Sequence, residues 1–204
     1  MTEDEARGWI AERFGREGEA RIADLAQLVI DEASRQNLIA PSTLSAIWER
    51  HIVDSAQLIE LAKESPGDWL DIGTGAGFPG LVVAALTDRP TILVEPRRRR
   101  AEFLRVAAGA LGLSNRVDVI AGKVEAIARP VAVISARAVA PLGGLFEAAM
   151  QCSRRKTLWI LPKGRTAREE VAVAQQTWHG VFHVEHSITD AESLIVLAKG
   201  VSRR

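Results

Sequence analysis

From residue 69 onward the sequence alternates short apolar runs with longer stretches of helical character, and this alternation constrains the fold more than any other feature. The runs expected to form strands are Trp69–Ile72, Thr91–Glu95, Val117–Ala121, Val131–Ser135, Thr157–Leu161, Val181–Ile188 and Ser193–Ala198. The stretches expected to form helices are Pro79–Leu86, Arg97–Leu111, Leu142–Gln151 and Ala167–Trp178. Strands that alternate with helices form a mainly parallel sheet covered on both faces. The sequence therefore predicts a doubly wound α/β fold.

The last two expected strands are connected differently from the others. Only the short segment Thr189–Glu192 separates them. A parallel pair requires a crossover of about a dozen residues or more, so these two strands must form an antiparallel hairpin. We therefore expect a seven-stranded sheet in which the first five strands are parallel and the C-terminal pair is antiparallel.

The first 65 residues carry helical patterns instead. Thr2 and Glu5 form a capping-box pair, which predicts a helix over residues 3–13. Two further apolar stripes recur at helical spacing, with Pro41 and Ser42 between them. The Pro-Gly turn within Ser65–Asp68 then ends this part of the chain. We expect a helical N-terminal extension over residues 1–65 and a Rossmann-like domain over residues 66–204.

The composition excludes several classes of protein. The chain of 204 residues is 47% hydrophobic and 25% charged, as in a packed globular domain. No apolar run approaches the ~18 residues of a membrane helix, and the acidic start lacks the features of a secretory signal. Because the single Cys152 cannot form an internal disulfide, we expect a reducing, cytoplasmic location. One Cys and four His disfavour a structural zinc site, and we expect no metal.

Charge is distributed unevenly along a chain whose net charge is zero. Residues 1–68 contain 7 basic and 14 acidic side chains, whereas residues 69–204 contain 19 basic and 12 acidic ones. A basic larger part favours a polyanionic partner, because contacts from Lys and Arg to phosphates dominate affinity for nucleic acids. A mixed-charge surface that merely divides unevenly explains the same numbers, so charge alone leaves both interpretations open. The sequence contains no heptad seam of the kind that would indicate an oligomer.

The sharpest local signal is the glycine-rich stretch Leu70–Gly80. An apolar strand ends at Ile72, alternating glycines follow, and Pro79 suits the first position of a helix. Glycines let the backbone turn tightly and approach a ligand beside the exposed amides of a helix start. The second expected strand ends in Glu95, and a carboxylate in that place can accept both hydroxyls of a ribose.

Two nucleotide-type interpretations of this loop compete. Gly75, Gly77 and Gly80 spell the G-x-G-x-x-G of dinucleotide-binding folds. However, the loop begins earlier, at Gly73, and an acid, Asp71, lies inside the strand end. The run D-x-G-x-G-x-G resembles the first motif of S-adenosylmethionine-dependent methyltransferases, in which the loop packs on the amino-acid half of the cofactor. The expected C-terminal hairpin agrees with the usual sheet of that family.

Further motifs narrow the resemblance. In order along the chain, they are Asn-Leu at 37–38, His-Ile-Val-Asp-Ser at 51–55, Asp-Ile-Gly-Thr-Gly-Ala-Gly-Phe-Pro-Gly at 71–80, Glu-Pro at 95–96, Gly-Lys-Val-Glu at 122–125, Ser-Ala-Arg-Ala-Val-Ala-Pro at 135–141 and Leu-Pro-Lys-Gly at 161–164. Together they resemble the bacterial small-subunit ribosomal RNA guanine-N7 methyltransferases, also called the glucose-inhibited division protein B family. One departure is Glu95–Arg100, where that family has Asp-Ser followed by Gly-Lys-Arg.

The resemblance implies a seven-stranded class I methyltransferase fold, S-adenosylmethionine as cofactor, and N7 of a guanine in small-subunit (16S) ribosomal RNA as methyl acceptor. The RNA partner would be either free or part of a ribosomal particle. Guanine N7 carries no proton, so no general base is required and positioning can supply most of the rate. Arg137 and Lys163 are candidates near the reacting centre, because each lies at the carboxyl end of an expected strand.

The resemblance also assigns individual residues. Those expected to bind the cofactor are Asp71, Gly73, Gly75, Gly77, Phe78, Glu95, Val124, Glu125 and Arg137. Independently of the resemblance, the basic residues that follow carboxyl ends of expected strands could meet RNA phosphates: Arg97, Arg98, Arg99, Arg100, Lys163, Arg165 and Arg168. Plainer interpretations remain open for several of these residues. Val124 and Glu125 could simply start a short helix, Arg137 could form a surface salt bridge, and the basic residues could lie in solvated loops.

Other polar residues and rival functions complete the predictions. His51, Asp54 and Ser55 occupy positions i, i+3 and i+4 of one helix, which favours a helical face turned towards the catalytic domain over a hydrolase triad. Cys152 fits a core or surface thiol. Rival functions are a nicotinamide-dependent oxidoreductase and a catalytically inactive RNA-binding protein of the same fold.

Overall fold

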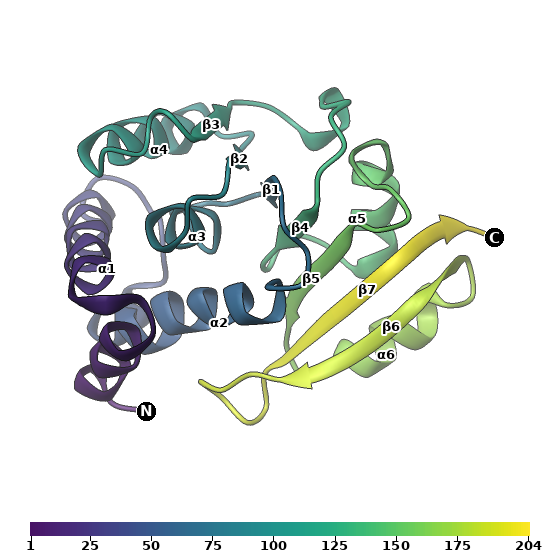
Figure 1. Cartoon of the computed structure of the whole chain (residues 1–204), viewed down its shortest axis with the longest axis horizontal. Coiled ribbons are helices and arrows are strands. Elements are labelled where there is room, and N and C mark those ends of the chain that lie inside the picture. Colours follow the sequence, from purple (N-terminus) through teal and green to yellow (C-terminus); the bar gives the residue numbers. More distant parts are fainter.

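The computed structural model describes residues 1–204 and contains one seven-stranded sheet (Figure 1). The strands are β1 Trp69–Ile72, β2 Thr91–Val94, β3 Val117–Ile120, β4 Val133–Ala136, β5 Leu158–Lys163, β6 Trp178–His186 and β7 Leu194–Arg203. Their order across the sheet is β3-β2-β1-β4-β5-β7-β6. Strands β1 to β5 are parallel, while β7 is antiparallel to both β5 and β6. The predicted topology is therefore confirmed.

The strand order determines where a ligand site can lie. Strand β1 pairs with β2 on one side and with β4 on the other, so the direction of winding reverses beside β1. In open α/β sheets, ligands bind outside the carboxyl ends of the strands at such a switch point. The glycine-rich loop follows β1 directly and therefore lies in this place.

The helices are α1 Glu3–Ala33, α2 Asp54–Leu61, α3 Gly80–Leu86, α4 Arg98–Ala110, α5 Leu142–Ala149 and α6 Ala167–Ala174. A 3₁₀ turn, η1 Pro41–Ala46, and a π-helical turn, η2 Trp48–Val53, lead into α2. Shorter 3₁₀ turns are η3 Val124–Ala126 and η4 Met150–Cys152. None of these helices is both long and apolar enough to span a membrane.

Helix α1 shows how the sequence forms its first element. Thr2 accepts a hydrogen bond from the amide of Glu5, and the Glu5 carboxylate accepts one from the amide of Thr2, as the capping box predicts. The helical stretch continues far beyond residue 13. Gly15, with φ of 73°, kinks it, and a second helical part follows as far as Ala33.

Two layers of helices cover the sheet. On one face, buried residues of α1, η2, α3 and α4 form a common core with Leu93 of β2. Trp69 of β1 extends this face towards α2. On the other face, α5 and α6 pack against β1, β2, β4, β5 and β7. The N-terminal helices thus bury their apolar faces against the helices that flank the sheet (Figure 1).

A further difference from the predicted elements concerns β6. The expected helix over Ala167–Trp178 ends at Ala174, and the strand begins at Trp178 instead of Val181. Trp178 packs edge-on against Phe146 of α5, with ring centroids 5.6 Å apart. A register shift at Gly180 interrupts the alternation of side chains, which explains why the apolar pattern concealed the first part of the strand.

Candidate active site

A cavity of about 810 Å³ lies at the carboxyl ends of β1, β4 and β5. Its walls come from four parts of the chain: the loop after β1, the segment Arg137–Pro141 after β4, the residues Pro162–Gly164 at the end of β5, and a side formed by η1, η2, α2 and the β6–β7 loop. Small-molecule sites occupy roughly 300–1,000 Å³, so the cavity is large enough for a nucleotide-sized ligand.

The loop after β1 depends on glycines at three positions. Gly73, Gly75 and Gly77 have φ of 66°, 60° and 95°, which strongly disfavours residues that carry a Cβ. A Cβ at Gly73 would lie 2.7 Å from Cγ2 of Val139. Gly73 and Gly75 line the cavity, whereas a Cβ at Gly77 would meet Leu81 in the following helix.

Asp71 of β1 holds this loop from the buried side, away from the cavity. It is fully buried, its Oδ2 accepts a hydrogen bond from the amide of Gly80 (2.9 Å), and its Oδ1 accepts one from the hydroxyl of Ser135 (2.7 Å). Ser135 in turn accepts a hydrogen bond from the indole of Trp69. Burial raises the pKa of Asp71 to about 6, against the opposite effect of the nearby Thr74 hydroxyl and of the hydrogen bonds from Ser135 and Gly80. The sequence grouped Asp71 with the cofactor-binding residues, but in the structure it does not line the cavity.

Glu95 is the second carboxylate that holds the loop. It is 3% exposed, its Oε2 accepts a hydrogen bond from the amide of Gly75 (3.0 Å), and its Oε1 accepts one from the amide of Arg97 (2.9 Å). Glu95 therefore ties the loop after β1 to the start of α4. It does not itself line the cavity, so its expected contact with a ribose stays a prediction.

Arg137 lies at the carboxyl end of β4 and lines the cavity, as the sequence predicted. Its Nη1 contacts Oδ2 of Asp54 (3.2 Å) and donates to the carbonyl of Arg50 (3.2 Å). Its Nη2 lies 2.9 Å from Nδ1 of His51, and its guanidinium lies 5.6 Å from the ring centroid of Phe78. Four contacts thus hold the guanidinium, and its side chain is 20% exposed.

The hydrogen-bond partners of His51 define its tautomer. Arg137 can only donate, so Nδ1 of His51 accepts and carries no proton. The hydroxyl of Thr43 donates to the carbonyl of Ala40 and can therefore accept the proton on Nε2 of His51 at 2.8 Å. Burial, followed by the charges of Arg137 and Arg50, lowers the pKa of His51 to about 3. His51 is a neutral acceptor for Arg137.

His51 also packs against the loop after β1. Its ring stacks on Phe78, with centroids 5.2 Å apart and planes at 18°. Asp54, one helical turn later, accepts hydrogen bonds through Oδ1 from Ser187 (3.3 Å) and Thr189 (3.2 Å) of the β6–β7 loop. The interpretation of His51 and Asp54 as a helical face turned towards the sheet domain is therefore correct. Ser55 donates to the carbonyl of His51 and belongs to the helix alone.

Lys163 is held inside the cavity wall. Its side chain is 10% exposed, and its Nζ donates to the carbonyl of Ala140 (2.6 Å) and pairs with Glu170 (3.0 Å). Glu170 also accepts a hydrogen bond from the amide of Leu142. Because its charge is compensated and largely buried, the expected contact of Lys163 with RNA phosphates does not fit this arrangement. Lys163 instead supports the segment after β4.

The remaining basic residues expected to meet RNA lie mostly at the surface. Arg97, Arg98 and Arg99 are exposed at the start of α4, and Arg100 lines the cavity and donates to the carbonyl of Asn37. Arg165 is exposed and pairs with Glu192 of the β6–β7 loop (3.2 Å), and Arg168 is exposed on α6. Arg97, Arg98, Arg99 and Arg100 form no ion pair, whereas Arg165 does.

Three residues or pairs from the predictions lie elsewhere. Val124 is buried and Glu125 is exposed in η3, so the plainer interpretation of a short helix describes them, and neither lines the cavity. Gly77 shapes the turn without lining the cavity. Cys152 is a buried thiol that donates to the carbonyl of Ile127, and burial raises its pKa.

The structure adds residues that the sequence analysis did not select. Thr43, Ser187 and Thr189 complete the hydrogen-bond network around His51 and Asp54. No local pattern pointed to them, because they come from a 3₁₀ turn and a hairpin loop far apart in the sequence. Thr74 lines the cavity, and its hydroxyl is buried without a hydrogen-bond partner. Thr74 was part of the glycine-rich motif and could have been selected from it.

Comparison with known proteins gives consistent relatives. The sequence model of the family described as rRNA small subunit methyltransferase G matches residues 19–194. The Ribosomal RNA small subunit methyltransferase G of Sphingopyxis alaskensis is 49% identical over 199 residues, covering 96% of this chain and 85% of the relative. The protein of the same name from Rhizorhabdus wittichii is 48% identical over 207 residues, covering 100% of this chain and 95% of the relative.

Solved structures resemble the fold at much lower sequence identity. The O-methyltransferase from Bacillus cereus in complex with SAH aligns with a TM-score of 0.58 and 14% identity, covering 87% of this chain and 90% of that one. The O-methyltransferase TomG from Streptomyces achromogenes in complex with SAM aligns with a TM-score of 0.59 and 13% identity, covering 86% and 89%. At these identities the likeness concerns the fold alone.

Proposed function

The chain belongs to the rRNA small subunit methyltransferase G family, and we propose that it transfers the methyl group of S-adenosylmethionine to N7 of a guanine in small-subunit (16S) ribosomal RNA. The observation that carries this proposal is the cavity at the switch point of the sheet, which is lined by the loop after β1 and the segment after β4. Such an enzyme would work in the cytoplasm, with residues 1–65 as a helical extension that completes the cavity.

The residues at the cavity fit this cofactor. Gly73 and Gly75 present bare backbone to the cavity, where a Cβ would be strained by the positive φ. The hydroxyl of Thr74 is a buried polar group that lacks a partner, and such groups are normally satisfied by a ligand or water. Together these features suit the polar amino-acid half of S-adenosylmethionine, which we place between this loop and Arg137.

The ribose and adenine of the cofactor would lie towards α4. Glu95 is the acid at the end of β2, and its oxygens keep acceptor capacity beyond the two amides that they already bind. We assign the ribose hydroxyls to Glu95, and the adenine to the region of Val124 and Glu125 at the end of β3. Both assignments require the wall between the cavity and these residues to open when the cofactor binds, because none of the three lines the cavity.

The chemistry requires little of the protein beyond positioning. When bound, S-adenosylmethionine supplies an electrophilic methyl group attached to a sulfonium sulfur. Guanine N7 offers a lone pair in the plane of the ring and has no proton to lose, so the chain needs no general base. Alignment of two reactants can account for about 7–11 kcal/mol of a barrier. Arg137 is fixed by His51 and Asp54, which suits a group that orients a ligand.

RNA would approach the carboxyl edge of the sheet. Arg97, Arg98 and Arg99 are exposed beside Arg100, which reaches the cavity. Positive charge at a helix start is locally unfavourable by several tenths of a kcal/mol for each residue, so a bound phosphate would relieve it. We propose that this cluster and Arg168 contact the RNA backbone, while Lys163 acts from inside the wall.

Transfer of a labelled methyl group tests the proposal. The purified chain, labelled S-adenosylmethionine and unmethylated small-subunit ribosomal RNA or ribosomal subunits should give labelled RNA. Borohydride reduction and aniline cleavage should then break the RNA at one guanine, because methylation at N7 makes a guanine reducible whereas unmodified guanines resist. Label in an exocyclic amino group, in a pyrimidine carbon, or no label with either substrate would refute the proposed reaction.

A further inference from the structure

A second hollow lies at the opposite edge of the sheet from the cavity. Its walls include residues that directly precede three parallel strands: Ser65 and Pro66 before β1, Val131 and Ala132 before β4, and Arg154–Thr157 before β5. Lys199 of β7 and Glu64 complete it, and its volume is about 750 Å³. Because these strands are parallel, their starts share the amino edge and their ends share the carboxyl edge. The two hollows are therefore separated by the full length of the strands.

The amino-edge hollow is basic and its charges are not compensated. Four of its residues carry positive charge, namely Arg154, Arg155, Lys156 and Lys199, and all four are exposed. No carboxylate pairs with any of them, although ion pairs bind many of the other arginines of the chain. Glu64 is the one acid in the wall. Several unpaired cations around one concave surface concentrate an attractive potential for anions.

The turn that carries three of these cations is rigid. The hydroxyl of Thr157 accepts a hydrogen bond from the amide of Arg154 (2.9 Å) and donates to the carbonyl of Val131 (2.7 Å). The guanidinium of Arg154 donates to the carbonyl of Ser153 (2.7 Å). The positions from which Arg155 and Lys156 extend are therefore fixed against the start of β4, while their exposed side chains form no hydrogen bond or ion pair with the protein.

Ser65 adds a polar group to the wall of the hollow. Its backbone is engaged within the protein, since its amide donates to Ala62 and its carbonyl accepts from Arg89. Its hydroxyl makes no hydrogen bond within the protein and is not among the side-chain atoms buried without a partner, so it is open to solvent and can donate to a phosphate oxygen in the hollow.

We propose that this amino-edge hollow is a second binding site for phosphates of the RNA backbone, remote from the methyl-transfer cavity. The inference rests on the proposed function, because RNA is the polyanion that the enzyme must hold. Long, freely extended cations around a wide hollow suit a flexible polyanion, whereas a site for one small anion uses converging backbone amides. The site would contact a different segment of the ribosomal RNA from the one that enters the cavity.

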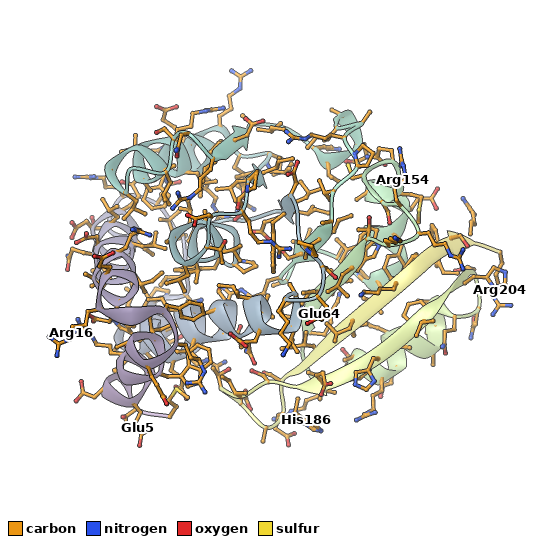
Figure 2. The ribbon with its side chains drawn as sticks, viewed as in Figure 1. Glu5, Arg16, Glu64, Arg154, His186 and Arg204 are labelled. Atoms are coloured by element: carbon orange, nitrogen blue, oxygen red, sulfur yellow. The ribbon has the colours of Figure 1, made fainter.

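A matched pair of double variants tests the site. Arg155→Ala/Lys156→Ala removes two exposed cations that form no hydrogen bond or ion pair within the protein, so the fold should be unaffected. Arg13→Ala/Arg16→Ala removes the same charge from α1. Arg16 and Arg154 lie on opposite sides of the molecule in the view of Figure 2. Binding of a small-subunit ribosomal RNA transcript would be measured for both variants over a salt series, together with S-adenosylhomocysteine affinity by calorimetry.

The expected results separate this site from the cavity. The slope of log affinity against log salt should fall by about 1.4–1.8 units in Arg155→Ala/Lys156→Ala, since each lost phosphate contact removes about 0.7–0.9. It should change little in Arg13→Ala/Arg16→Ala, and S-adenosylhomocysteine affinity should be unchanged in both. An unchanged slope in the first variant, or equal losses in both variants, would overturn the proposed site.

Two further measurements, methyl transfer by the wild type and binding of inorganic tripolyphosphate, distinguish failure of the second site from failure of the proposed function. If the wild-type protein methylates the RNA while Arg155→Ala/Lys156→Ala binds it with an unchanged slope, the second site is wrong and the proposed function stands. If the wild-type protein transfers no methyl group to the RNA, the proposed function itself fails. Inorganic tripolyphosphate is the control for a small-anion site: strong thermal stabilisation that the double variant abolishes, with RNA binding unaffected, would overturn the assignment to RNA.

Discussion

The loop after β1 and the segment after β4 both line the cavity and meet where Val139 lies against Gly73, yet different contacts hold them in place. The loop after β1 is held by Asp71 and Glu95, which lie at the ends of adjacent strands and bind loop and helix amides. The segment after β4 is held by side chains that come from far away in the sequence. His51 and Asp54 lie more than 80 residues from Arg137, which they bind.

The loop after β1 is therefore a backbone wall of the cavity, and the segment after β4 is a side-chain wall. The first wall requires only glycines and two carboxylates, so a short local motif specifies it. The second includes Ala138, a non-glycine residue with φ of 55°, which persists because Arg137 on one side and the Lys163 contact to Ala140 on the other fix the segment. We expect the first wall to fail through single backbone changes and the second through loss of remote partners.

The largest effect is expected at the backbone wall. Gly73→Val places a β-branched residue at φ of 66° and a Cβ against Val139, so the loop must move. Affinity for S-adenosylhomocysteine should fall by more than about a hundred-fold, or about 2.7 kcal/mol. Far-UV circular dichroism should stay near native, as in the control Gly8→Val, whose site has open space. Unchanged cofactor affinity in Gly73→Val would contradict the placement of the loop.

The side-chain wall should break at Arg137. Arg137→Ala leaves Asp54 and His51 without their shared donor, and a hydrogen bond to a charged group contributes about 1.5–3 kcal/mol. We expect S-adenosylhomocysteine affinity to fall by about ten- to a hundred-fold. Arg137→Lys should recover only part of it, because one ammonium cannot reach all the acceptors. The wall would be misassigned if Arg137→Ala kept both its affinity and its turnover.

A smaller effect is expected at Glu95, and here the test must separate two roles. Glu95→Gln should weaken S-adenosylhomocysteine binding by about ten-fold. If Glu95 contacts the ribose hydroxyls, a cofactor analogue without those hydroxyls should bind weakly to the wild type, and its affinity should fall little further in the variant. If the variant weakens both ligands equally, Glu95 acts only through the amides of Gly75 and Arg97.

Substitution of His51 should have the smallest effect on cofactor affinity at neutral pH. The neutral state of His51 should instead be visible in how the free energy of unfolding depends on pH. The pKa of His51 is about 3 in the fold and about 6.5 in the unfolded chain, so below pH 6.5 only the unfolded chain gains the proton. Stability from this group is therefore complete above pH 6.5 and decreases as the pH falls. Urea unfolding measures this difference. Between about pH 7.5 and pH 5.5, the free energy of unfolding of the wild type should fall by about 1.4 kcal/mol more than that of His51→Gln.

A parallel pH dependence in the two proteins would mean that His51 titrates normally in the fold. The variant is a fair comparison because a glutamine can accept from Arg137 through its oxygen and donate to Thr43 through its amide. Cofactor affinity at neutral pH should accordingly change less in His51→Gln than in Arg137→Ala.

The sequence predicted the sheet and the backbone wall well, for a physical reason. Alternating strands and helices, the short hairpin connection and the D-x-G-x-G-x-G loop are local patterns, and each one limits the chain to few conformations. Asp71 shows the limit of a motif: it belongs to the pattern, but it acts from behind the loop on Gly80 and Ser135.

The side-chain wall could be predicted only in part, because its contacts join segments that no local pattern connects. The sequence indicated the helical face of His51 and Asp54 and, separately, Arg137 at the cavity, but it did not show that they bind each other. Lys163 was assigned to RNA because it follows the carboxyl end of a strand, on the edge where the pocket opens, with Arg165 and Arg168 nearby. Its burial against Ala140 and Glu170 depends on the packing of α6, which the sequence does not reveal.

The central claim is that the two walls bring a guanine N7 to the methyl group by position alone, and one substitution in the RNA tests it directly. Small-subunit ribosomal RNA would be transcribed with 7-deazaguanosine, which replaces N7 by carbon and keeps the Watson–Crick edge. The account predicts full transfer of labelled methyl to normal RNA, none to the substituted RNA, and comparable binding of both. Transfer to the substituted RNA at a similar rate would contradict it.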